Sequence, residues 1–146
     1  MRTVSLLSRT SAVPEGVAVN CAGVIFVHGS RFGHALFISD KKLHYAYNFP
    51  GIKPEQKFVS PELKPGKHTP CMEFIRDKAG KYGESLGTTK LYVNYKAVAE
   101  GPMRTRPGKF TLSGDGLCIG RDSGHAVSKL CKTPSTFKAA RSRLLV

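Results

Sequence analysis

The sequence predicts an all-β domain in which antiparallel strands pack in two layers. Three observations predict it: apolar residues recur at every second position, the apolar runs are short, and turn-forming residues separate them. No segment shows the periodicity of an amphipathic helix several turns long, so little helix is expected. A chain of 146 residues has the usual size of one domain with its own hydrophobic core.

The first half of the chain contains four runs that are typical of strands. Residues 23–28 are β-branched and aromatic, which favours a buried strand, and residues 35–39 continue the pattern. Residues 40–42 predict a tight turn into the strand 43–49, and residues 55–59 form a further short strand. Alternation within 43–49 places four residues on one face: Leu43, Tyr45, Tyr47 and Phe49.

Strand signals continue in the second half. Residues 68–76 alternate weakly but contain Pro70, which favours an edge or bulged strand, and residues 77–87 predict a loop. Residues 88–95 predict a strand whose hairpin partner is 97–101. The residues expected on one face of the first of these strands are Thr89, Leu91, Val93 and Tyr95.

The last third of the chain gives less regular signals. Short strands are expected at 109–112 and 117–119. Alternation then stops, and residues 136–146 fit a helix, a strand or a frayed tail equally well.

Charge is the strongest compositional signal. The formal net charge is +13, from 23 basic and 10 acidic residues, which argues against cationic partners and keeps polyanions such as sulfated glycans or nucleic acid as candidates. The densest basic segment is 103–109, and the candidate anion-contact residues are Arg104, Arg106 and Lys109. No apolar run is long enough to span a bilayer, so no membrane partner is expected.

The four cysteines are widely spaced and include no Cys-x-x-Cys pair, which argues against a zinc site. The apolar segment near Met1 is too short for a secretory signal. We therefore interpret the thiols as buried or incidental and expect a reducing, cytoplasmic location, while disulfides stay open as an alternative. The cysteines are Cys21, Cys71, Cys118 and Cys131.

Motifs for catalysis or metal binding are weak. The five histidines are scattered, although His28 and His44 could converge across neighbouring strands. The segment 120–124 carries Asp122 between glycines and favours a structural Asx-turn over a calcium site, because calcium sites recruit several carboxylates. Cys131 has no sign of a helix start or a partner base, so it is interpreted as unreactive.

Several motifs, taken in order, resemble one known family. They are GSRFGHALFI (29–38), LHYAYNFPG (43–51), PGKHT (65–69), TTKLYV (88–93) with its hairpin to AEG (99–101), and GRDSGHAVS (120–128). Together they resemble the C-terminal region of bacterial arylsulfatases, over about residues 22–130. The resemblance implies a β-rich accessory module that follows an α/β catalytic domain.

The resemblance does not extend to sulfatase chemistry. The family uses a Cys- or Ser-x-Pro-x-Arg segment, converted to formylglycine, beside a calcium site of several Asp and Asn. Here CKTPS (131–135) has one residue too many before its proline and lacks the arginine, and the four aspartates are dispersed. An activated nucleophile and a clamping cation are both needed for sulfate-ester hydrolysis, so we expect no enzyme activity and no cofactor.

We therefore expect a single β-sandwich over residues 1–146, of the jelly-roll or concanavalin-like kind. Residues 1–21 and 131–146 depart from the family pattern and are expected to be altered or frayed. The expected role is that of a non-catalytic arylsulfatase accessory domain or fragment. Its expected partner is a sulfatase catalytic domain or a second copy of the chain, and polyanion binding is the alternative.

Overall fold

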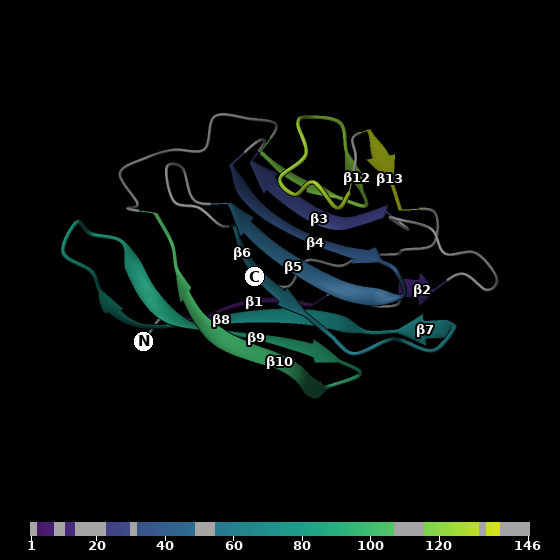
Figure 1. The fold of residues 1–146 in the computed structure, drawn as a ribbon, viewed down its shortest axis with the longest axis horizontal. Coiled ribbons are helices and arrows are strands. Elements are labelled where there is room, and N and C mark those ends of the chain that lie inside the picture. The colour runs from purple at the N-terminus through teal and green to yellow at the C-terminus, as the bar shows by residue number, and fades with distance from the viewer. Residues whose placement is uncertain are drawn as a thin grey trace.

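Two antiparallel sheets stack face to face in the computed structural model, which describes residues 3–7, 11–13, 23–29, 32–48, 55–106, 116–131 and 134–137 (Figure 1). A five-stranded sheet has the order β11-β3-β4-β5-β6, and a four-stranded sheet has the order β1-β8-β9-β10. Two small pairs, β2-β7 and β12-β13, complete the described part of the chain. All of its regular structure is strand, as the sequence predicts.

The strand bounds follow the chain order. In the five-stranded sheet they are β3 (Gly23–Gly29), β4 (Gly33–Ser39), β5 (Lys42–Asn48), β6 (Gln56–Val59) and β11 (Leu117–Ile119). In the four-stranded sheet they are β1 (Thr3–Leu7), β8 (Pro70–Ala79), β9 (Ser85–Val93) and β10 (Lys96–Arg104). The small pairs are β2 (Ser11–Val13) with β7 (Gly66–His68), and β12 (Arg121–Asp122) with β13 (Ser135–Thr136).

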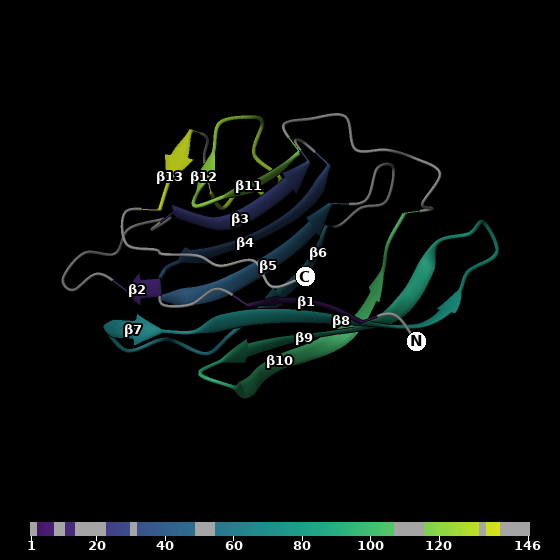
Figure 2. The same cartoon turned by 180° about the vertical axis from the view of Figure 1, so that it is seen from behind.

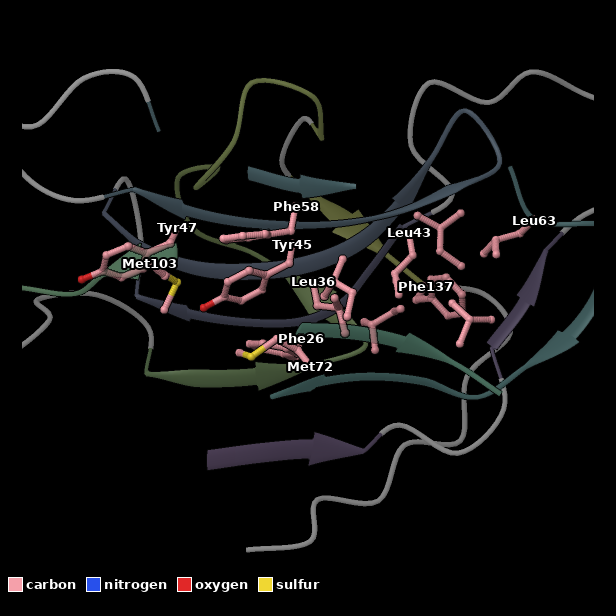
Figure 3. Packing of buried hydrophobic residues seen from close by; sticks show 14 residues of the cluster. Phe26, Leu36, Leu43, Tyr45, Tyr47, Phe58, Leu63, Met72, Met103 and Phe137 are labelled. Atoms are coloured by element: carbon pink, nitrogen blue, oxygen red, sulfur yellow. The ribbon is translucent and has the colours of Figure 1, made fainter. Parts of the chain in front are cut away.

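The main core fills the space between the two sheets. Leu36 and Tyr45 lie opposite each other on β4 and β5, and both are completely buried. Leu91 faces them from the four-stranded sheet and is also completely buried. Tyr47 and Met103 lie at one end of this layer and Leu63 lies at the other (Figure 3).

A second apolar cluster covers the outer face of the five-stranded sheet. Phe37 and Ala46 point away from the main core and are buried under Val127 and Cys131. The views from front and back both show β12 and β13 near β3, at the end of the sheet away from β6 (Figures 1 and 2). Because both of its faces are covered in part, β3, β4 and β5 are almost continuously buried.

Two tight turns adopt left-handed backbone at non-glycine residues. Asp40 and Lys41 have φ of 49° and 58°, and Asn94 and Tyr95 have φ of 51° and 66°. Two successive positive φ values are typical of the type I′ turns whose twist matches two-residue hairpins. The prediction that Tyr95 shares a strand face with Thr89, Leu91 and Val93 is therefore wrong, because Tyr95 lies in the turn and its side chain is 78% exposed.

The structure also corrects the expected loop between β8 and β9. The predicted loop 77–87 is shorter, since β8 runs to Ala79 and β9 begins at Ser85. Strand β8 is not an edge strand, because β1 and β9 flank it. Pro70 is tolerated at its first position, and the expected bulge lies between Arg76 and Lys78.

Some expectations fall outside the described residues. They concern Phe49, the strand 109–112 and the tail beyond Phe137. Phe137 itself is buried in the main core. Within the described residues, the structure contains no helix of the length and hydrophobicity needed to span a bilayer.

Candidate functional site

A row of polar side chains crosses the five-stranded sheet at one end of the main core. Strand register places His28 opposite His34, His34 opposite Tyr47, and Tyr47 opposite Gln56. Because residues that are direct neighbours across strands share a face, all four belong to the face that meets the other sheet. We call these residues, His28, His34, Tyr47 and Gln56, the polar row.

The polar row begins where the apolar core ends. The next aligned row toward the middle of the sheet is Phe26, Leu36, Tyr45 and Phe58. These four side chains are buried, whereas His28 and His34 are partly exposed. In Figure 3 the hydroxyl groups of Tyr45 and Tyr47 point toward the end of the layer where Met103 lies.

Aromatic contacts and one hydrogen bond fix His34. Its Nδ1 is hydrogen-bonded to the Tyr45 hydroxyl, and its ring centroid lies 4.4 Å from that of Tyr47. The His28 ring is stacked beside it, with centroids 6.3 Å apart and planes 17° from parallel. Tyr45 is completely buried, so its hydroxyl needs this partner, and the bond in turn orients the imidazole.

Burial and nearby basic groups disfavour charge on His34. Burial is the main reason why the pKa of His34 falls to about 3, and His28 and Arg106 lower it further. Burial likewise raises the pKa of Tyr45 and of Tyr47. His34 is therefore a neutral hydrogen-bonding group at physiological pH.

The other sheet closes the row through backbone groups. The Gln56 amide donates to the Arg104 carbonyl over 2.7 Å, and its oxygen accepts the Arg104 N–H over 2.8 Å. The Tyr47 hydroxyl accepts the Arg106 N–H over 2.8 Å. These three bonds join β5 and β6 to the end of β10 and to the residues that follow it.

The predicted anion-contact residues have different environments. The Arg104 guanidinium lies 3.3 Å from the Glu84 carboxylate, which is itself buried. Arg106 is partly buried beside the polar row, and its charge acts on both His34 and Tyr47. Lys109 lies outside the described residues.

The expectation that His28 and His44 could converge is wrong. His28 does not converge with His44, because His44 lies on the outer face, stacked on Phe37 with centroids 5.2 Å apart. His28 lies opposite His34 instead. The sequence carried a signal for this pair, since His28 and His34 flank a glycine-bearing hairpin at equal distances from its centre.

Two further expectations concern the segment after β11. The Gly124 N–H donates to Asp122 Oδ1 over 3.2 Å, which is the Asx-turn that the sequence favours. Cys131 is disulfide-bonded, so the interpretation of all four cysteines as thiols is wrong for this residue. Cys71 and Cys118 are not disulfide-bonded, and Cys21 lies outside the described residues.

No group of three or more His, Cys, Asp or Glu side chains is placed to hold a metal ion within the described ranges. What the polar row offers is hydrogen-bond donors beside a guanidinium. Such an arrangement suits binding of an anionic oxygen group.

Comparison with known proteins gives one distant likeness. No family model matches the chain, and no curated protein matches it. Among solved structures, domains LG4-5 of the mouse laminin alpha1 chain are similar, with a TM-score of 0.53 and 15% sequence identity. The match covers 99% of this chain, which spans 38% of the length of that laminin chain. The likeness concerns the fold alone and confirms the predicted antiparallel β-sandwich of the jelly-roll or concanavalin-like kind.

Proposed function

We propose that the protein is a non-catalytic accessory domain of the kind that forms the C-terminal region of bacterial arylsulfatases. The observation that carries the proposal is where its resembling motifs lie. The described residues of each motif fall on strands or turns that build the sandwich. An accessory module is expected to resemble its relatives through such scaffold positions.

Two motifs illustrate this structural role. In GSRFGHALFI, Gly33 starts β4 with φ of 149°, and a Cβ there would lie 2.1 Å from the His28 carbonyl oxygen. In GRDSGHAVS, Asp122 accepts the Gly124 N–H, and Val127 and Ser128 are buried against the outer face of the five-stranded sheet. These residues shape the backbone and cover a sheet, which are structural roles.

Strand β11 is the best described surface for a partner. It is an edge strand, and its side chains Leu117 and Ile119 are 45% and 37% exposed. Edge strands with exposed apolar side chains favour association with another chain. The proposed partner is a sulfatase catalytic domain, and the alternative is a second copy of this chain.

Sedimentation velocity tests the accessory role. The purified chain is mixed with the catalytic core of a bacterial arylsulfatase from which the C-terminal region has been removed. We expect a one-to-one complex that Ile119→Asp weakens and that Leu130→Asp leaves intact, since Leu130 is similarly exposed at 39% but outside β11. Two separate boundaries at high concentrations of both proteins would contradict the proposal, and a dimer of the chain alone would assign β11 to self-association.

A second candidate function, polyanion binding, is favoured by how the charges are paired. Several carboxylates lie in ion pairs, among them Glu55 with Lys57, Glu62 with Lys41, and Glu100 with Lys90. Other basic side chains are exposed and form no ion pair within the described residues: Lys64, Lys67, Arg76, Lys78, Lys96, Arg121 and Lys129. The remaining surface field is therefore positive.

Chromatography tests this second candidate. Polyanion binding releases counterions, so the affinity falls steeply with salt. We expect the protein to elute from heparin at a higher sodium chloride concentration than from a sulfonate cation exchanger of similar charge density. Equal elution from the two columns would reduce the candidate to ordinary ion exchange.

We also infer that the chain works in an oxidising compartment, in place of the cytoplasmic location expected from the sequence. The inference is supported by the disulfide at Cys131, because disulfides persist mainly outside the reducing cytosol. A thiol count, described in the Discussion, tests it.

A further inference from the structure

We propose that the polar row and Arg106 form a binding site for one tetrahedral oxyanion, of the sulfate class. The site comprises Arg106, His28 and His34, at the end of the sandwich where β3, β4 and β5 meet the chain that follows β10. This goes beyond the accessory role and does not depend on it.

Arg106 is a basic residue whose charge is not neutralised by the described residues. Its side chain is partly buried, yet it forms no ion pair with any residue in the described part of the chain. Its neighbour Arg104 differs, because Glu84 neutralises it at 3.3 Å. A guanidinium on a partly buried residue gains from a partner of opposite charge, and an anion supplies one.

A further argument is the row of donors beside Arg106. Tyr45 has its hydroxyl against His34 Nδ1, so a hydroxyl that donates there leaves the His34 proton on Nε2. Among the described residues, His34 Nε2 and the His28 ring have no hydrogen-bond partner. The His28 and His34 rings and the backbone of Arg106 therefore lie at the same end of the sandwich, with Arg106 against Tyr47 and His34 beside it. The Arg106 guanidinium brings five further donors to this end.

The electrostatic field at His34 is positive. The titratable groups whose charge acts on His34 are His28 and Arg106, and both are basic. Both lower the pKa of His34, as positive neighbours do. No carboxylate of the described residues is among the groups that act on His34, so the local field there favours an anion.

The donor set also predicts selectivity. A guanidinium fork matches two oxygens of a tetrahedral anion, and the imidazole N–H groups suit the others. Sulfate carries no proton at neutral pH and needs only donors. Hydrogen phosphate carries an O–H that needs an acceptor, and the Tyr47 hydroxyl oxygen already accepts the Arg106 N–H. We therefore expect sulfate to bind more tightly than phosphate, and acetate to bind more weakly than sulfate.

Nuclear magnetic resonance of the histidine rings tests the site. Sodium sulfate is titrated into the folded, ¹⁵N-labelled full chain at neutral pH, with sodium chloride adjusted to hold the ionic strength constant. We expect the His28 and His34 ring signals to shift and saturate as a single site. His44 serves as an internal control, because it lies buried on the opposite face of the sheet. Its signals should not move.

Two matched variants locate the binding. Arg106→Gln should weaken sulfate at least tenfold. Lys96→Gln removes the same charge from the other end of β10, where Lys96 is exposed, and should change the affinity less than twofold. If Arg106→Gln does not fold, Arg106→Lys keeps the charge but loses the planar fork and should still weaken sulfate severalfold.

The results that would overturn the sulfate site differ from those that would overturn the accessory role or heparin binding. Sulfate shifts that do not saturate, that move all histidines alike, or that both charge variants weaken equally would overturn the site. Equal affinity for sulfate, phosphate and acetate would also overturn it.

Discussion

Gly33 marks the position where β4 leaves the turn after β3, and its backbone excludes other residues. Its φ is 149°, and a Cβ would lie 2.1 Å from the carbonyl oxygen of His28. No real Cβ tolerates such a contact, so the two strands would have to separate at the edge of the polar row.

We expect Gly33→Ala to lower the free energy of unfolding by roughly 2–4 kcal/mol, from backbone strain and steric conflict together. Urea denaturation measures this. Gly116→Ala is the matched control, because Gly116 also has positive φ, at 73°, but no atom lies within 4 Å of the added carbon. It should cost about 1 kcal/mol, the penalty of left-handed backbone alone. Equal losses in the two variants would contradict the steric account.

His34 makes stability depend on pH. Burial holds the pKa of folded His34 at about 3, against an ordinary value of 6.5. Between these two values the unfolded chain binds a proton that the folded chain does not. The free energy of unfolding therefore falls as the pH falls through this window, by at most about 1.4 kcal/mol per pH unit.

Urea denaturation at pH 7 and pH 5 checks the sign and size of this effect. His34 should account for a loss of about 2 kcal/mol between these two pH values. His34→Gln removes that share and should show a shallower dependence, while His44, whose pKa burial also lowers, still contributes in the same direction. Parallel pH profiles for the two proteins would contradict the assignment to His34.

The turn between β9 and β10 gives a test of how turn residues contribute to stability. In the turn between β9 and β10, Asn94 and Tyr95 both have positive φ, and the Tyr95 side chain is 78% exposed. Asn-Gly is the preferred pair for this type of turn. Tyr95→Gly should therefore raise the free energy of unfolding by about 1 kcal/mol.

Tyr95→Ala is the control for that gain. Alanine also strains left-handed backbone, so this variant should stay close to the parent protein. Thermal unfolding of the three proteins makes the comparison, and a Tyr95→Gly protein less stable than the parent would show that the exposed tyrosine packs more than its exposure indicates.

The strands that could be predicted from sequence are those with one clear apolar face. Alternation in 43–49 places Leu43, Tyr45 and Tyr47 on one face, and the structure confirms it, since all three belong to the main core. The end of β8 could not be predicted in this way. Residues 77–79 lack an apolar face, and only their pairing with β9, opposite Leu86 and Ser85, makes them strand.

The candidate site was predictable only in part. Charge density pointed to Arg106, but not to what surrounds it. Pairing of β3 with β4 brings His28 to His34 across a short hairpin, whereas the bonds from Gln56 to Arg104 join residues 48 positions apart. Local pattern carries no information about such long-range contacts, so Glu84 as the partner of Arg104 also escaped prediction.

For the molecule as a whole, the disulfide sets the number of free thiols. Cys131 is disulfide-bonded, whereas Cys71 and Cys118 are not, so we predict two titratable thiols among the four cysteines. Titration of the denatured, unreduced protein with a thiol reagent should give two thiols per chain, and four after reduction. Reduction should also lower the midpoint of thermal unfolding, because a cross-link restricts the unfolded chain. Four thiols before reduction in protein made in an oxidising compartment would contradict the disulfide and the compartment inferred from it.

The non-catalytic role is tested most directly by measuring hydrolysis of 4-nitrophenyl sulfate by the purified chain, with and without added calcium. A sandwich whose resembling motifs serve strands and turns should release nitrophenol no faster than buffer alone under either condition. Saturable turnover that a single substitution in the chain abolishes would show that it carries catalytic machinery of its own.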